Sequence, residues 1–188
     1  MERYETVWPL SVQRQQSRTT VTSNEDMNQA RIAFVWDNLF YGDRMFELIR
    51  GQLSRRWPQA SFVGHEEFPD IHGTDFDETG GTDQLLSALS KHEATGVVVA
   101  VGACGSCTPV VLRAAAAIES SGIPAVAICG EAFGPMAAVI AEAEGFPDLP
   151  TVLYPGPGLI MTDSAELFRQ KVLNDVLPQV TAGLQRTA

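Results

Sequence analysis

Two cysteines three positions apart carry the strongest chemical signal in this sequence of 188 residues. Cys104 and Cys107 form a C-x-x-C that follows a strongly apolar segment, residues 96–102, and precedes a predicted helix. The free N–H groups and partial positive charge of a helix N-terminus stabilise a thiolate and lower its pKa. Two intervening residues, one of them Gly105, let the sulfurs approach closely enough for a disulfide. The motif therefore predicts nucleophilic or redox chemistry rather than simple packing.

The same loop has the residue types of an anion site. The hydroxyl of Ser106, the flexible Gly105 and Thr108 lie where free N–H groups at a helix start could cradle a carboxylate or a phosphate. Thr108 followed by Pro109 predicts an N-cap and a first helical residue. We therefore assign Gly105, Ser106 and Thr108 to substrate binding.

No metal or cofactor is expected from the motif spacings. The sequence has no second C-x-x-C and no H-x-x-x-H pair to complete a zinc tetrahedron. It also lacks the G-x-G-x-x-G and Walker A patterns of nucleotide-binding loops.

Two further predicted strands end in polar or nucleophilic residues. Asp37 and Asn38 follow the first strand, where they either orient a substrate and take a proton or form a plain turn and cap. Cys129 ends the fourth strand and is followed by Glu131; it either lines the same crevice as a third thiol or packs in the core. We list Asp37 with the catalytic residues, and Asn38, Cys129 and Glu131 with the substrate-binding residues.

An acidic segment, residues 66–82, lies between the second strand and the next helix. Its acidic residues and histidines lack a metal-ligand spacing such as H-E-x-x-H, so we interpret the segment as a solvated loop that is long enough to act as a lid. The cluster comprises His65, Glu66, Glu67, Asp70, His72, Asp75 and Asp77.

Short apolar runs alternate with helical patterns along the chain. The runs predict strands at 31–36, 61–64, 96–102, 123–128 and 151–154, and the patterns predict helices at 45–56, 82–93, 108–121, 135–144 and 163–177. Five such units predict an α/β fold with a three-layer, doubly wound, open parallel sheet. In the flavodoxin-like order 2-1-3-4-5, the ligand crevice lies between the first and third strands. The C-x-x-C and Asp37 should therefore meet there.

Length and composition limit the organisation and the partners. We expect a polar N-terminal tail at 1–29, with an apolar exception at 7–10, a single α/β domain at 30–182 and a C-terminal tail at 183–188. A net charge of −10 makes nucleic acid and membrane surfaces poor partners. With no signal peptide and no membrane span, we expect a cytoplasmic protein, and base rates favour a homo-oligomer.

The longest informative stretches resemble the UGSC family of proteins and selenoproteins. The resemblance covers about residues 30–180 and rests on 96–108, continuing through 122–129, with supporting matches at 37–38 and 145–150. Some members of that family carry selenocysteine where this chain has Cys104, which implies that Cys104 is the reactive position. Residues 154–157, Tyr-Pro-Gly-Pro, replace a Pro-His-Pro-like turn, so a general base is missing there. The loop at 38–41 is also more aromatic than the family pattern.

Three functions remain open at this point. The favoured one is a thiol-dependent oxidoreductase in which Cys104 attacks and Cys107 resolves a mixed disulfide or sulfenate with a thiol or redox partner. The second is a cofactor-independent lyase, isomerase, racemase or hydrolase of a small carboxylate, with Cys104 opposite Cys129 or Asp37. The third is a non-catalytic subunit that binds a small molecule.

Overall fold

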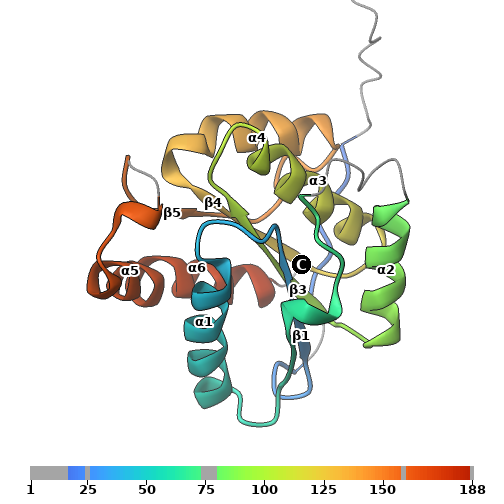
Figure 1. Cartoon of the computed structure of the whole chain (residues 1–188). Coiled ribbons are helices and arrows are strands. Elements are labelled where there is room, and N and C mark those ends of the chain that lie inside the picture. Colours follow the sequence, from blue (N-terminus) through green and yellow to red (C-terminus); the bar gives the residue numbers. More distant parts are fainter. Residues whose placement is uncertain (1–16, 24–25, 73–79, 158–159, 187–188) are drawn as a thin grey trace, which may run out of the picture.

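Five parallel strands form the centre of the molecule, in the order β2-β1-β3-β4-β5 (Figure 1). The computed structural model describes residues 17–23, 26–72, 80–157 and 160–186. All four strand pairings are parallel, and β1 lies between β2 and β3. The structure confirms the predicted α/β class and the order 2-1-3-4-5.

The strands and helices alternate along the chain as parallel crossover connections require. The strands are β1 (Arg31–Trp36), β2 (Ser61–Val63), β3 (Gly96–Gly102), β4 (Ala125–Gly130) and β5 (Thr151–Tyr154). The helices are α1 (Gly42–Arg56), α2 (Gly81–Lys91), α3 (Cys107–Ser120), α4 (Gly134–Ala143), α5 (Ala165–Lys171) and α6 (Leu177–Leu184). A π-helical turn, Val172–Val176, joins α5 to α6, and short 3₁₀ turns occupy His65–Glu67, Glu131–Phe133 and Ile160–Thr162.

Both faces of the sheet are covered, which makes the central strands apolar throughout. Helices α1, α5 and α6 cover one face of the sheet, and α2, α3 and α4 cover the other (Figure 1). In the first part of β3 the side chains alternate, so Val98 belongs to the core on the first face and Val97 and Val99 belong to the core on the second. Every residue of β3 is buried as a result. The strand ends at Gly102, two residues before the first cysteine of the C-x-x-C.

Several element ends differ from the sequence-based expectation. Helix α3 begins at Cys107 and its N-cap is Ser106, so the prediction of Thr108 as the N-cap was wrong. The Thr108 hydroxyl instead donates to the carbonyls of Gly102 (3.1 Å) and Cys104 (2.8 Å). The helical hydrogen bonds begin before Thr108, because the Thr108 N–H already donates to the Cys104 carbonyl. For this reason the helix begins at Cys107.

The last helical segment is longer than its apolar pattern suggested. The Ser164 side chain caps α5 by accepting from Leu167 N–H, and the helical path continues through the π-helical turn to Leu184. It therefore runs past residue 182, where we placed the domain boundary. Strand β4 begins at Ala125 rather than at residue 123.

Part of the N-terminal segment is docked on the domain. Within residues 17–23, Arg18 N–H donates to Gly145 O (2.7 Å), Ser23 N–H donates to Arg186 O (2.8 Å) and Val21 N–H donates to Glu119 Oε2 (2.7 Å). These bonds hold the segment near the amino end of β4. The apolar residues 7–10 lie outside the described part of the chain. None of the described helices combines the length and hydropathy that a membrane-spanning segment needs.

Candidate functional site

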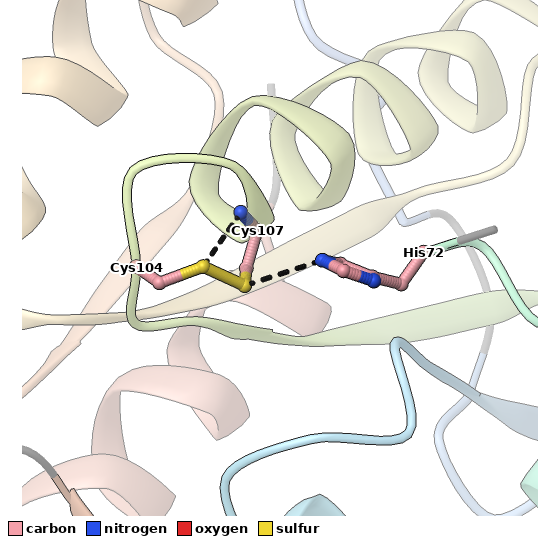
Figure 2. Close-up of side chains that lie close together, drawn as sticks. All are labelled: His72, Cys104 and Cys107. Carbon is pink, nitrogen blue, oxygen red and sulfur yellow. Dashed lines mark hydrogen bonds between the residues drawn. A yellow bond between two sulfur atoms is a disulfide. The ribbon is translucent and has the colours of Figure 1, made fainter. Parts of the chain in front are cut away.

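A disulfide joins Cys104 and Cys107 directly after β3 (Figure 2). Their Cα atoms are 5.1 Å apart, and Gly105 and Ser106 form the exposed turn between them. Cys104 is half-buried, while Cys107 is 1% exposed in the first turn of α3. Of the two cysteines, Cys104 is therefore the more accessible residue.

Hydrogen-bond donors surround the sulfur of Cys104. The Cys107 N–H donates to Cys104 Sγ over 2.9 Å, and the Ser106 hydroxyl lies 3.3 Å from the same atom. In the reduced protein these groups stabilise negative charge on Cys104, because a hydrogen bond to the charged form favours that form. The N-terminus of α3 adds its own partial positive charge. The geometry therefore favours Cys104 as the thiolate of the pair.

His72 is a site residue that the sequence interpretation missed. Its Nε2 lies 3.6 Å from Cys107 Sγ, although 35 positions separate the two residues in the chain (Figure 2). Two neighbours place it there: Ile71 is fully buried in the core, and Asp70 Oδ1 accepts from the His72 N–H over 2.9 Å. The surrounding segment was assigned to a solvated loop. The available signal was the single apolar residue, Ile71, between polar neighbours.

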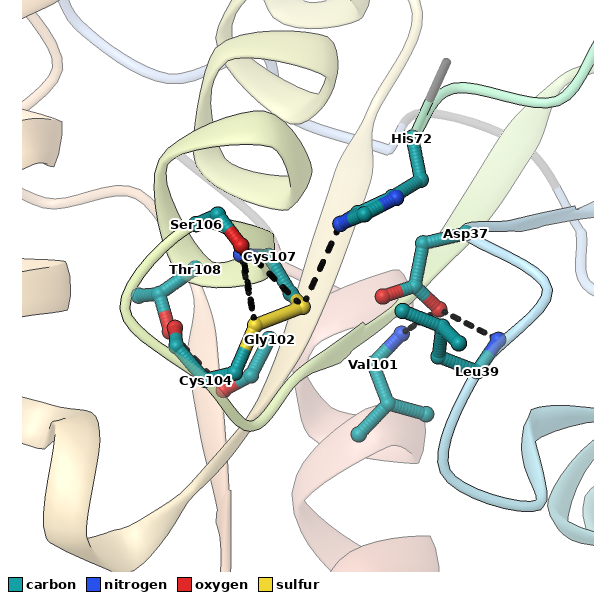
Figure 3. Close-up of a disulfide and its surroundings, with 9 residues drawn as sticks. All are labelled: Asp37, Leu39, His72, Val101, Gly102, Cys104, Ser106, Cys107 and Thr108. Atoms are coloured by element: carbon teal, nitrogen blue, oxygen red, sulfur yellow. Dashed lines mark hydrogen bonds between the residues drawn. A yellow bond between two sulfur atoms is a disulfide. The ribbon is translucent and has the colours of Figure 1, made fainter. Parts of the chain in front are cut away.

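Asp37 lies at the carboxyl end of β1, beside the disulfide loop (Figure 3). Its Oδ1 accepts from Val101 N–H (2.9 Å) and Leu39 N–H (3.3 Å). Its Oδ2 has no hydrogen-bond partner among the described residues, and the residue is only 1% exposed. Burial raises the pKa of Asp37 to about 6, against the opposing effect of the two amides and of His72. The end of β1 next to the disulfide loop thus carries a carboxyl group whose pKa is raised toward neutral pH.

We expect Asp37→Asn to change how stability depends on pH. Because the pKa rises from 3.8 to about 6 on folding, the native state binds more protons than the unfolded state within this window, and stability falls as pH increases. The shift corresponds to about 3 kcal/mol. In the oxidised protein, the unfolding free energy of Asp37→Asn minus that of the wild type should grow by about 2–3 kcal/mol between pH 4 and pH 7.

Urea titrations at a series of pH values measure this difference. The amide introduced by Asp37→Asn does not titrate, so any stability that it costs is the same at every pH. It therefore does not alter the pH dependence of the difference in unfolding free energy. A difference that does not vary with pH would show that the Asp37 carboxyl keeps its ordinary pKa.

The structure places Cys129 in the core, where it packs against the end of β3. It is fully buried, its sulfur packs against Gly102, and burial raises its pKa to about 12. A side chain at Gly102 would collide with the Cys129 sulfur and with the backbone of Thr108, so only glycine permits this close approach. Cys129 is thus held as a neutral thiol.

The other residues that were predicted to bind substrate lie partly in the disulfide loop and partly outside it. Gly105 and Ser106 are exposed in the disulfide turn, whereas Thr108 is fully buried and bonded to backbone carbonyls. Asn38 is exposed in a left-handed backbone conformation (φ 57°). Glu131 accepts from the Gly156 N–H over 2.6 Å, so it braces the turn after β5.

Another polar cluster stabilises that turn, where the chain departs from the expected Pro-His-Pro pattern. Tyr154 Oη and Lys171 Nζ both donate to Asp163 Oδ2, each over 2.7 Å. Burial opposes the charge on Asp163, but its two partners outweigh that effect and lower its pKa. Burial, followed by the bond to Asp163, raises the pKa of Tyr154. The cluster anchors α5 to the end of β5.

The two cysteines of the disulfide and the neighbouring His72 are also potential metal ligands. His72, Cys104 and Cys107 each offer one ligand atom, and these atoms all lie within 4.8 Å of one another. Spacing within either segment gave no sign of a metal site because the ligands come from two distant parts of the chain.

Comparison with known proteins assigns the chain to a family. The sequence model of the UGSC family matches residues 5–186, nearly the whole chain. This chain belongs to the UGSC family. No curated protein matches this UGSC protein, and no solved structure matches it. The family assignment made from the C-G-S-C-T segment and its flanks is confirmed.

Proposed function

We propose that this UGSC protein is a thiol–disulfide oxidoreductase that uses Cys104 as the attacking thiolate and Cys107 as the resolving thiol. The observation that carries the proposal is the Cys104–Cys107 disulfide at the start of α3, in which Cys104 is half-buried and Cys107 is buried. The sulfur of Cys104 also accepts the hydrogen bonds that stabilise a thiolate. A nucleophile must be reachable and charged, and a resolving thiol needs only to reach its neighbour.

The electron balance of the cycle is simple. The Cys104 thiolate attacks one sulfur of a substrate disulfide, forms a mixed disulfide and expels the other substrate sulfur as a thiolate. Cys107 then attacks Cys104 Sγ, the mixed disulfide breaks, and the second substrate thiolate leaves. The substrate disulfide gains two electrons and the cysteine pair loses two. A dithiol partner returns the pair to the reduced state by the reverse exchange.

His72 and Asp37 supply the proton chemistry of the second step. The buried Cys107 must lose its proton before it attacks, and His72 Nε2 lies 3.6 Å from its sulfur, where a neutral imidazole accepts that proton. The Asp37 carboxylate interacts electrostatically with His72 and favours the imidazolium that results. This pair fills the base role that the missing Pro-His-Pro histidine left open.

The second alternative, a lyase, isomerase, racemase or hydrolase, loses its Cys104–Cys129 form but keeps its Cys104–Asp37 form. A lyase, isomerase or racemase of the two-thiol type needs a second thiol that ionises, but Cys129 is buried and has a pKa of about 12. That function and the non-catalytic binding subunit stay predictions.

A redox titration with alkylation tests the proposal. Equilibration in a series of dithiol buffers, denaturing alkylation and intact mass measurement should show two species: one label on the oxidised chain, at Cys129, and three on the reduced chain. The transition should follow a two-electron curve, in which the ratio of the species changes tenfold for about every 30 mV.

The same experiment can also reject the proposed oxidoreductase. A pair that stays reduced throughout, with Cys104 alone alkylated rapidly in the native protein, would reject the oxidoreductase. It would leave a catalyst that works with a single thiolate.

A further inference from the structure

The reduced disulfide loop and His72 together have the composition of a catalytic zinc site. Zinc in proteins is bound by thiolate and imidazole groups, and a Cys₂His set leaves the fourth position of the tetrahedron open for water or substrate. His72, Cys104 and Cys107 form such a set, with their ligand atoms within 4.8 Å of one another. Soft thiolates also discriminate against magnesium and calcium, which prefer oxygen ligands.

The placement of the imidazole matches what zinc requires. In a tetrahedral site with Zn–S near 2.3 Å and Zn–N near 2.05 Å, a bound nitrogen and sulfur lie about 3.6 Å apart. The observed separation of His72 Nε2 and Cys107 Sγ is 3.6 Å, and the nitrogen faces the sulfur (Figure 2). The histidine is thus positioned for the ion before the thiols are released.

Two other features suit a divalent cation at this place. The Cys107 N–H already donates to Cys104 Sγ, as an outer-sphere partner does for a metal-bound thiolate. The buried Oδ2 of Asp37 has no partner among the described residues, and Figure 3 shows it on the side of the carboxylate toward the disulfide. This unpartnered oxygen is an independent sign that a hydrogen-bond donor or a cation belongs beside it.

We propose that the reduced form of this protein binds one Zn²⁺ through His72, Cys104 and Cys107, and that disulfide formation expels the ion. The sulfurs must separate to about 3.8 Å to bind zinc, so the disulfide and the zinc complex exclude each other. A phosphine reductant supplies two electrons, becomes the phosphine oxide with oxygen from water, and leaves two thiols. Zinc then displaces the two thiol protons into the buffer. This inference needs only a reducible pair, so it goes beyond the proposed catalytic cycle.

The test compares reduced and oxidised protein under anaerobic conditions. After removal of the phosphine, Zn²⁺ is titrated against a colorimetric chelator, and Co²⁺ serves as a probe whose sulfur-to-metal charge-transfer band reports thiolate ligation. We expect one ion per reduced chain and none at this site in the oxidised chain. Bound zinc should also slow reoxidation of the pair by a small disulfide.

A matched pair of histidine variants assigns the ligand. His72→Gln should weaken zinc binding at least about 10-fold, since it removes a direct ligand. His92→Gln is the control, because His92 Nε2 pairs with Glu67 (3.4 Å) away from the disulfide. Unfolding curves of the two oxidised variants check that both are folded. Equal affinity of the two variants, or equal binding by oxidised wild type, would overturn the inference.

Failure of this inference is separable from failure of the proposed function. A reduced chain that binds no zinc while its disulfide still titrates reversibly overturns the zinc site alone. A chain that binds zinc but never forms the disulfide in dithiol buffers supports the zinc site and rejects the oxidoreductase.

Discussion

Cys107→Ser, reduced and mixed with a small disulfide such as oxidised glutathione, should stop at a stable mixed disulfide on Cys104. Attack by Cys104 needs only the thiolate, which keeps the backbone N–H of residue 107 and the Ser106 hydroxyl as neighbours. Resolution needs a sulfur at residue 107, and a serine hydroxyl does not displace a thiolate. Intact mass should therefore show one glutathione adduct per chain, whereas the wild type passes on to the internal disulfide.

Cys104→Ser is the matched control for this experiment. Its remaining thiol at residue 107 is 1% exposed in the native structure, so we expect adduct formation to be slower by about two orders of magnitude, consistent with the accessibility that exchange requires. Catalytic turnover with a dithiol and a disulfide should be lost in both variants. Full turnover by Cys107→Ser would show that Cys104 works alone, and the proposed cycle would be wrong.

Arg186→Ala should destabilise the folded protein strongly. Glu119 is only 2% exposed, and its carboxylate accepts from the N–H groups of Ala125 (2.6 Å) and Val21 (2.7 Å) and pairs with the Arg186 guanidinium. Arg186 also donates to Val21 O (2.8 Å) and Ala125 O (3.0 Å). Loss of the guanidinium leaves a buried charge uncompensated, which costs about 3–5 kcal/mol.

Urea unfolding of the oxidised protein at neutral pH measures this cost. Arg113→Ala is the control, because its pairing with Glu144 is solvent-exposed and should be worth less than about 1 kcal/mol. Adding Glu119→Gln to Arg186→Ala removes the orphaned charge, so the double variant should lose less than the sum of the two single variants, by about 1–3 kcal/mol. Strict additivity would contradict a buried ion pair at this position.

The Arg186 network also shows how parts of the two predicted tails contact the domain. Residues 1–29 and 183–188 are polar and lack a period, so they were assigned to tails, yet Val21 and Arg186 meet at the buried carboxylate of Glu119. A buried charge is stabilised by partners that lie far away in sequence, 98 and 67 positions in this case. The residues next to Glu119 in the sequence therefore do not reveal these partners.

Most of the fold could be predicted from the sequence because strands and helices have patterns that extend over only a few residues. A run such as residues 96–102 is apolar on both faces, and helical spacing follows it, so the alternation alone predicts a covered parallel sheet. Element ends were less certain: Thr108-Pro109 has the form of a cap, but the Cys104 backbone and sulfur take up the N–H groups of the first turn one residue earlier. The residue at which a helix begins depends on which acceptors the first N–H groups bond to. The sequence shows which acceptors are nearby but not which of them forms the bond.

By itself the sequence determined the family, the five-stranded topology and the presence of a C-x-x-C where β3 meets α3. These follow from residue type and short spacing, which act over a few positions of the chain. Only the tertiary structure decided that Cys129 lies buried in the core, that Asp37 Oδ2 is left without a partner among the described residues, and that His72 faces Cys107. The reason is physical: burial, pKa and ligand sets depend on the groups that surround an atom in space, and in this site those groups come from four separate segments of the chain.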